Sequence, residues 1–264
     1  MDSSDERNLL VWEFARLVGE LQPRVFVMEN VAALATHQKW QNVRERLMRE
    51  FKDHGYEVNQ LILNSRNYGV AQSRERVFFI GTAKHIDPIS AVDPLDPCMY
   101  TVYDVLKGLP PPGKHPNMGA CKAKVTLARN PDLRKSPYAG LLLNGGGRPV
   151  NLHAPINTLL ASMGGNKTPV IDEQALRSGG PSWFEEHHQR LTRGEEVSSE
   201  EPPPYIRRLS VTEAALLQSF PLTFQFVGSQ SSQFRQIGNA VPPKLAHSIA
   251  AAAAQVLRSD AAKK

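Results

Sequence analysis

The chain has 264 residues, of which 41% are hydrophobic, and this is enough for one large domain or two modest ones around a packed core. No apolar run approaches the roughly 20 residues that cross a bilayer, and the N-terminus is acidic where a secretory signal would be basic, so we expect a cytoplasmic protein without a membrane partner. The net charge of +5 and the pI of about 9.2 permit a nucleic-acid partner but do not single one out.

Hydrophobic spacing predicts alternating helices and strands in the first part of the chain. Apolar residues recur at helical spacing over residues 7–21, and residues 24–28 follow as a short buried strand. A second helix is predicted over residues 40–51, and further strands over residues 57–63 and 77–81. This alternation favours crossover units on a mostly parallel sheet, whose strand ends are the usual place for a site.

Proline and glycine become frequent after residue 81, and helical periodicity fades apart from a short segment at 102–109. We therefore predict a domain boundary near Leu109. The segment 193–204 is rich in acidic residues and proline, which is typical of an exposed loop.

Regular structure is predicted to resume at Leu209. Ser210 can cap a helix, with Glu213 as its capping-box partner, and Pro242 with Pro243 can open a final helix. The predicted division of the chain is therefore into residues 1–109, 110–208 and 209–264.

Three short segments carry the most functional information: 27–31 (Val-Met-Glu-Asn-Val), 72–76 (Gln-Ser-Arg-Glu-Arg) and 235–243 (Arg-Gln-Ile-Gly-Asn-Ala-Val-Pro-Pro). Glu29 comes at the end of a predicted strand, where a carboxylate would project into the crevice above a parallel sheet. A surface or capping glutamate is the alternative. The third segment, taken alone, is only a turn and the start of a helix.

The second segment has polar residues in alternation. Gln72, Arg74 and Arg76 precede the apolar strand, so their side chains should lie on one face. The alternative is a solvated, charged edge strand.

The order and setting of these segments resemble the later half of the conserved motif series in cytosine-C5 DNA methyltransferases. The flanking residues over 5–31, 64–81 and 208–221 also look like the family's pattern, and the resemblance covers most of residues 5–258. It implies an α/β fold: part of a doubly wound, Rossmann-like methyltransferase domain, with a smaller, irregular, mainly β target-recognition domain.

The resemblance also implies roles for individual residues. Glu29 would contact the target cytosine at N3, Arg76 would hold its O2, and Arg74 would support the site or a phosphate. Asn30 and Gln72 are expected to contact the substrate DNA. The residues expected beside S-adenosylmethionine are Asn239, Ala240 and Val241.

Glycine-rich segments between residues 136 and 169 resemble the recognition region of bacterial members of the family. Their glycines would let the backbone approach double-stranded DNA closely. Ordinary glycine-rich surface loops are the alternative. The residues suited to phosphate or base-edge contacts are Arg148, Asn166, Lys167 and Thr168.

The Pro-Cys-Gln nucleophile of the family and its glycine-rich cofactor loop do not occur in these 264 residues. Cys98 follows a proline, but it comes after the arginine motif and lacks the glutamine, so we interpret it as structural or incidental. With Cys121 as the only other cysteine, neither a disulfide framework nor a four-cysteine metal site can form, and we expect no metal.

The chain therefore looks like half an enzyme. The hypothesis is a split methyltransferase in which an N-terminal partner chain supplies the Pro-Cys-Gln cysteine and most of the S-adenosylmethionine site, and helices of this chain bury apolar faces against it. A truncated chain or a gene fragment would have the same sequence. The alternatives are a non-catalytic DNA-binding or regulatory subunit, and methylation of RNA, which the long recognition region makes less favoured.

Overall fold

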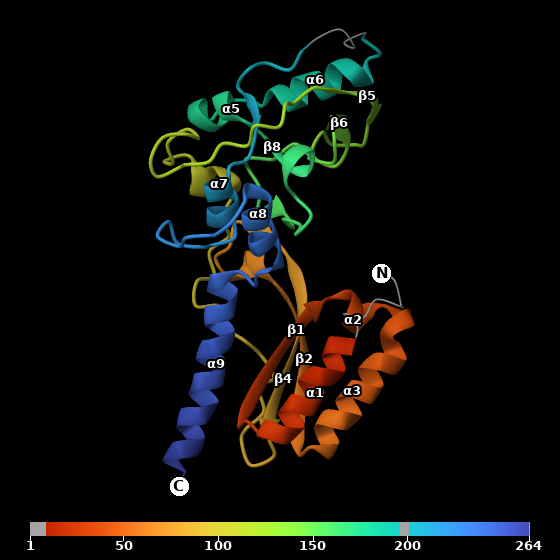
Figure 1. Ribbon diagram of the computed structural model, residues 1–264, viewed down its shortest axis with the longest axis vertical. Helices are drawn as coiled ribbons and strands as arrows, with labels where there is room; N and C mark the ends of the chain where they lie inside the picture. Colours follow the sequence, from red (N-terminus) through yellow and green to blue (C-terminus); the bar gives the residue numbers. More distant parts are fainter. Residues whose placement is uncertain (1–8, 196–200, 264) are drawn as a thin grey trace.

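The computed structural model describes residues 9–195 and 201–263. The molecule is elongated: a sheet with its covering helices forms one end, and α7 and α8 lie between it and the other end (Figure 1). The other end is formed mainly by residues 102–208 and is called the recognition end below, after the role that the sequence predicts for it. The predicted helix start at Arg7 and the centre of the predicted loop at 193–204 lie outside the described residues.

A three-stranded antiparallel sheet forms the first end of the molecule. Its order is β1-β4-β2, and both pairings with the central strand are antiparallel, so the prediction of a mostly parallel sheet is wrong. The reason is the short connection between β2 and β4, because a parallel crossover needs about a dozen residues or more and usually a helix. The strands are β1 (Val25–Val31), β2 (Tyr56–Asn64) and β4 (Glu75–Ala83).

Helices cover both faces of this sheet (Figure 1). Alternate residues of β4 supply the two faces: Val77 and Phe79 pack with α1 (Leu10–Leu21) and α3 (Gln41–Asp53), and Phe78 and Ile80 pack with α9 (Pro243–Ala262). The short helices α2 (Ala33–Thr36) and η2 (Gln38–Trp40) connect β1 to α3. Successive apolar residues of β4 therefore pack into two separate cores, one on each face of the sheet.

The helices and strands predicted for this part are confirmed, although most of their ends differ by one to three residues. α1 ends at Leu21, and the chain turns through a left-handed Gln22 before Pro23. β1 continues to Val31, beyond its predicted end at Met28, so Glu29 lies within the strand rather than after it.

The recognition end combines short strand pairs with helices. Its strands are β3 (Gln72–Ser73) with β7 (Ile156–Asn157), β5 (Leu127–Asp132) with β6 (Leu141–Leu143), and β8 (Val170–Asp172) with β9 (Ile206–Arg208). Its helices are α4 (Val102–Leu106), α5 (Glu173–Ser178) and α6 (Trp183–Thr192), with the 3-10 turn η4 (Gly165–Lys167). The 3-10 turn η3 (Ser65–Tyr68) follows β2, and its Tyr68 packs in the apolar cluster under α9.

The expectation of an irregular, mainly β recognition domain is therefore too narrow, because α5 and α6 were not predicted. In α6, the buried His187 occupies a core-facing position beside the buried Phe184. A polar residue on the buried face weakens the apolar repeat by which a helix is recognised from sequence.

α7 (Val211–Leu217) and α8 (Gln230–Asn239) join the two ends. The predicted capping box of Ser210 and Glu213 is confirmed, as is the start of α9 at Pro242 and Pro243. One apolar cluster contains residues of α4, α5, α7 and α8, so segments from all three predicted divisions share a core. The boundaries at 109 and 208 stay predictions.

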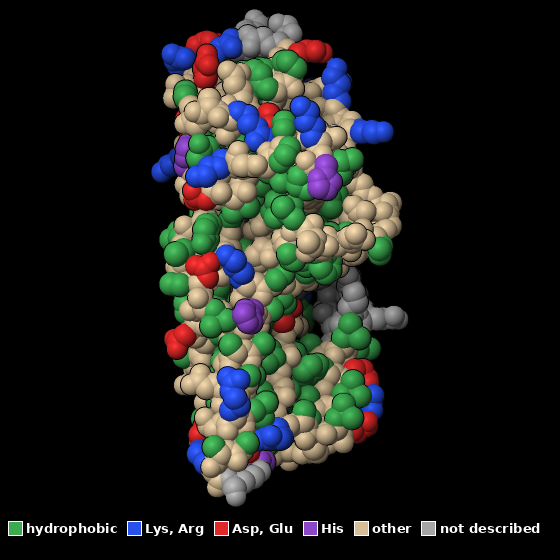
Figure 2. All heavy atoms as spheres, turned by 90° about the vertical axis from the view of Figure 1, so that its left-hand side faces the viewer, with side chains coloured by type: hydrophobic (Ala, Val, Ile, Leu, Met, Phe, Trp, Pro, Cys, Tyr) green, Lys and Arg blue, Asp and Glu red, His purple; other side chains and the backbone are tan. Residues whose placement is uncertain are grey.

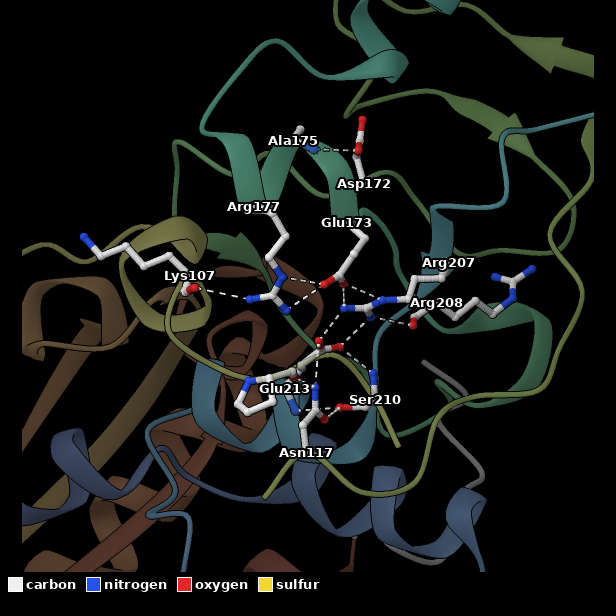
Figure 3. A network of polar contacts seen from close by, with 11 residues as sticks. Lys107, Asn117, Asp172, Glu173, Ala175, Arg177, Arg207, Arg208, Ser210 and Glu213 are labelled. Carbon is white, nitrogen blue, oxygen red and sulfur yellow. Dashed lines mark hydrogen bonds and ion pairs between the residues drawn. The ribbon is translucent and has the colours of Figure 1, made fainter. Parts of the chain in front are cut away.

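An ionic network ties β9 to the helices on either side of it (Figure 3). The Arg207 guanidinium bonds to Glu173 at the start of α5 and to Glu213 in the first turn of α7. Burial alone would lower the pKa of Arg207, but the Glu213 and Glu173 carboxylates raise it overall. Glu213 also accepts a hydrogen bond from Asn117.

Arg207→Met is expected to lower the free energy of unfolding by about 3–5 kcal/mol, because it leaves the Glu213 carboxylate, 1% exposed, without its cation. Urea unfolding followed by circular dichroism measures the change. Arg16→Met is the matched control, since the ion pairs of Arg16 are exposed and such pairs contribute about 0–1 kcal/mol. Equal losses for the two variants would contradict a structural role for the network.

None of the helices within residues 9–195 and 201–263 is long and apolar enough to cross a bilayer. In the same residues, no group of three or more His, Cys, Asp or Glu side chains could hold a metal ion. Basic and acidic side chains alternate over the face that carries α9, and the described part of this face has no field of a single sign (Figure 2).

Candidate active site

Glu29 and Arg76 form an ion pair at one end of the sheet. In the antiparallel pairing of β1 with β4, Glu29 lies opposite Phe78 and Val31 lies opposite Arg76, so Glu29 and Arg76 are diagonal neighbours on one face. Arg76 Nε lies 3.0 Å from Glu29 Oε1, and the two side chains are 17% and 29% exposed. An acid and a guanidinium are thus held side by side where a ligand can still reach both.

A pocket of about 300 Å³ opens over this pair. Its volume is at the lower end of the range for small-ligand sites, which suits a single ring rather than a larger ligand. Three parts of the fold supply its walls: β1 with the start of β4, a recognition segment at 159–161, and the end of α8. The lining residues are Glu29, Asn30, Val31, Arg74, Arg76, Leu159, Leu160, Ala161, Gly238 and Asn239.

Arg74 is the buried cation of the pocket, at 2% exposure. Its Nη1 donates to the Leu159 carbonyl at 3.3 Å, whereas its buried Nε has no partner among the described residues. Burial, followed by the nearby Arg76, lowers the pKa of Arg74 to about 10, and Glu29 partly opposes this. Arg74 therefore stays charged at neutral pH, and its Nε–H is a buried donor without a partner among the described residues.

Gln72 does not join Arg74 and Arg76 on one face. It belongs to β3, which pairs with β7, and the chain leaves that strand before β4 begins. Its side chain is fully buried: Nε2 donates to Gln218 Oε1 at 3.0 Å, and Oε1 accepts from the Leu159 N–H at 3.4 Å. The expected DNA contact by Gln72 is therefore out of reach, and the residue braces the pocket wall instead.

Gln218 completes this brace, and the sequence did not indicate its role. Its Nε2 donates to the carbonyls of Ile237 and Ala240, at 2.6 and 2.9 Å. The Gln72–Gln218 pair thus joins the recognition segment to the end of α8 beneath the pocket. One feature of the sequence could have indicated this role: Gln218 directly follows a buried apolar helix, where burying an unpaired amide would cost free energy.

Gly238 lets α8 approach the wall at 159–161. A Cβ at Gly238 would lie 2.3 Å from the backbone nitrogen of Ala161 and 2.5 Å from its Cα. Backbone atoms cannot move aside as a side-chain end can. The pocket wall therefore depends on a glycine at this position.

Gly238→Ala is expected to lower the free energy of unfolding by about 1–3 kcal/mol through this overpacking. Chemical denaturation measures it. Gly108→Ala is the matched control, because a Cβ at Gly108 meets no atom within 4 Å. A stability of Gly238→Ala equal to that of the control would contradict the close contact.

The residues expected beside the cofactor lie at the edge of the pocket. Asn239 is exposed and lines it, Ala240 uses its carbonyl to accept from Gln218, and Val241 packs against the apolar cluster under α9. Asn30 also lines the pocket, and its side-chain oxygen accepts from the Val31 N–H at 2.8 Å. Of these three residues only Asn239 lines the pocket, and the expected contact with a cofactor stays a prediction.

The residues expected to read DNA lie on adjacent loops, with one exception. Arg148, Asn166 and Lys167 are exposed, and Arg148 and Lys167 line a groove of about 660 Å³. This groove shares Leu159 and Leu160 with the pocket, so the two openings are neighbours. Thr168 is fully buried, and its side chain is not available for a DNA contact.

Leu160 was not indicated by the sequence, although it lines both the pocket and the groove. It is 60% exposed and lies between the two openings. No pattern distinguishes it from its buried neighbour Leu159.

Comparisons with known proteins identify the family of the chain. The C-5 cytosine-specific DNA methylase family model matches residues 1–255. The chain is similar to the Type II methyltransferase M1.HphI of Haemophilus parahaemolyticus, at 34% identity over 95% of the chain and 62% of that protein. It is also similar to the Type II methyltransferase M.FnuDI of Fusobacterium nucleatum, at 30% identity over 94% of the chain and 69% of that protein.

Among solved structures, the fold is similar to that of a protein described as a DNA modification methyltransferase encoded within an E. coli prophage. The TM-score is 0.65 at 22% identity, over 97% of this chain and 76% of the other. The chain spans less than two thirds of the length of M1.HphI. The family model nevertheless matches residues 1–255, which is almost all of this chain. The chain therefore belongs to the C-5 cytosine-specific DNA methylase family.

Proposed function

We propose that this chain supplies the base-binding and target-recognition part of a DNA (cytosine-5-)-methyltransferase. The single observation that carries the proposal is the Glu29–Arg76 pair, held at 3.0 Å in a small pocket beside the groove of Arg148 and Lys167. A scaffold for DNA binding alone has no need of an acid and a guanidinium in a ring-sized pocket.

In the proposed reaction, the two side chains prepare cytosine for attack. C5 is a poor nucleophile, and it becomes reactive only after a thiolate adds to C6. The Glu29 carboxyl shares a proton with N3, which draws charge from the ring, and the Arg76 guanidinium binds O2. S-adenosylmethionine, when bound, supplies the electrophilic methyl group, and Asn239 to Val241 would form one wall of its site.

The target atoms of cytosine lie inside the base stack, so the base must leave the duplex before it can reach Glu29. The pocket size supports this step, since it admits one ring and no duplex. Arg148, Asn166 and Lys167 would hold the surrounding double-stranded DNA through phosphate and base-edge contacts. In this proposal, Arg74 supports the site or a phosphate as the buried cation that lines the pocket.

The thiolate is proposed to come from a separate polypeptide that carries the Pro-Cys-Gln segment and most of the cofactor site, in a heterodimer. Two surfaces support a missing neighbour. Within the described residues, β1 and β2 each pair only with β4, so the outer edge of β1 is open, as is that of β2. α1 also exposes a row of leucines at helical spacing, Leu10, Leu17 and Leu21, at 64%, 43% and 74%.

α9 was also expected to bury an apolar face against the partner. Its apolar side chains instead pack on this chain's own sheet, where Leu245 and Ile249 are 0% and 5% exposed. The proposed partner surface is therefore restricted to β1 and α1. The names of the similar type II enzymes support a place in a restriction-modification system.

The test is to mix the chain with a segment carrying Pro-Cys-Gln, taken from the neighbouring reading frame or from the upstream part of a matching relative. Labelled S-adenosylmethionine is added together with mixed-sequence duplex DNA or, in a parallel reaction, with RNA, and the nucleosides are separated. We expect 5-methyldeoxycytidine in the DNA. Transfer of the labelled methyl group to RNA but not to DNA would contradict the proposal. The absence of methylated product with every complementing segment would also contradict it and would favour a regulatory DNA-binding subunit.

A further inference from the structure

β9 carries two consecutive arginines that point in opposite directions (Figure 3). Arg207 faces α5 and α7, where carboxylates surround it. Arg208 faces the recognition loops and, at 2% exposure, is the largest fully buried side chain among the described residues. The alternation of side chains along a strand explains the opposite directions.

Among residues 9–195 and 201–263, the Arg208 guanidinium bonds only to neutral oxygens. Nη1 donates to the Thr168 carbonyl at 2.8 Å, and Nη2 donates to Asn144 Oδ1 at 2.9 Å. Longer contacts of 3.3 and 3.4 Å reach the carbonyls of Ala123 and Lys124. Burial lowers the pKa of Arg208, and no carboxylate pairs with it in the described part of the chain. The cost of burying this cation is met by carbonyl and amide oxygens of three separate loops.

Two of these loops touch backbone to backbone above the guanidinium. The N–H groups of Gly146 and Gly147 both donate to the Asn166 carbonyl at 3.2 Å. A Cβ at Gly147 would lie 2.1 Å from the Thr168 carbonyl oxygen and 2.7 Å from Arg208 Nη1. The backbones of these two loops are therefore in direct contact, and the Arg208 guanidinium lies next to this contact.

The outer sides of the same loops carry the exposed residues Arg148, Asn166 and Lys167. Arg208 itself is too deeply buried to touch DNA. We propose that Arg208 is the positioning residue of the recognition surface: its guanidinium holds segments 123–124, 144–148 and 165–168 in one arrangement and thereby sets the DNA sequence discrimination of the chain. This inference rests on the proposed function, because discrimination requires that the loops read DNA.

The first measurement is hydrogen exchange on the free full chain, which does not depend on DNA. Arg208→Met removes every donor while keeping a long side chain, and Arg208→Lys keeps the charge with fewer donors. We expect amides 144–147 and 166–168 to exchange about 10- to 100-fold faster in Arg208→Met, with unchanged exchange in β1, β2 and β4. Arg208→Lys should be intermediate, and it serves as the measured variant if Arg208→Met does not fold.

The second measurement is selection from a random duplex library, followed by affinities for selected and random duplexes over a range of salt. Arg208→Met should reduce the ratio of these affinities by about 10-fold or more, with an unchanged salt slope. The control Arg148→Met should reduce the salt slope by about one and leave loop exchange unchanged.

Exchange in the Arg208 variants equal to the parent chain would overturn the proposed clamp. A reduced salt slope would overturn it too, because it would mean that Arg208 contacts phosphate. If the parent chain selects a site and Arg208→Met selects it with equal discrimination, the positioning role alone fails. If the parent chain selects no sequence, the discrimination role fails together with the proposed function, whereas the exchange data still decide whether Arg208 holds the loops.

Discussion

Arg76→Ala, in the chain combined with its complementing segment, is expected to lower kcat by about 100- to 1000-fold, the loss typical of removing one donor that stabilises developing charge. The structure gives the reason, because Arg76 is the guanidinium that lies beside Glu29 in the pocket, at 3.0 Å. Glu29→Gln should cause a loss of about 100-fold or more, since an amide cannot supply a proton to N3. Single-turnover methyl transfer measures both rates.

Cys98→Ser is the control for these variants. Cys98 is an exposed free cysteine and does not line the Glu29–Arg76 pocket, so its removal should leave the rate unchanged. Unchanged rates for both Arg76→Ala and Glu29→Gln would contradict the proposed chemistry and favour a regulatory subunit. A large loss in Cys98→Ser would contradict the assignment of the thiol to another segment.

The second large effect is expected from assembly. The chain by itself should transfer no methyl group, and activity should appear when the Pro-Cys-Gln segment is added. Because the exposed leucines of α1 are proposed to lie in the interface, Leu17→Glu with Leu21→Glu should weaken association by about 10- to 100-fold. Titration of the complementing segment, followed by activity and by analytical ultracentrifugation, measures this.

Leu133→Glu is the matched control for the interface. Leu133 is 41% exposed, close to the 43% of Leu17, but it lies just beyond β5 in the recognition part. Its substitution should leave the titration unchanged. Robust methylation by the chain alone would contradict the split enzyme, and equal effects of Leu133→Glu and the α1 variant would contradict the proposed interface.

Features set by neighbouring residues could be predicted from the sequence. The Ser210–Glu213 capping box and the start of α9 at Pro242 depend on groups within one helical turn, so local reasoning sufficed. The pairing of Glu29 with Arg76 required more, because spacing alone does not bring residues of separate strands together. The family resemblance supplied that expectation, and the antiparallel register of β1 and β4 accounts for the contact.

Features set by distant partners were missed. The alternation of Gln72, Arg74 and Arg76 predicts one shared face only if a single strand contains all three, and the chain changes strands between Ser73 and Glu75. β4 runs antiparallel to β2 because the connection between them is short. Hydrophobic spacing predicts strands but not their relative direction. Likewise, no local pattern indicates that Arg208 collects oxygens from loops up to 85 residues away in sequence.

The most direct test of the account is a structure of the complemented protein on a duplex that it methylates. We expect one cytosine to lie outside the stack in the pocket of Glu29 and Arg76, with N3 within hydrogen-bond distance of the Glu29 carboxyl and O2 within hydrogen-bond distance of the Arg76 guanidinium. A stacked target base, with both side chains directed away from any cavity that holds a pyrimidine ring, would contradict it.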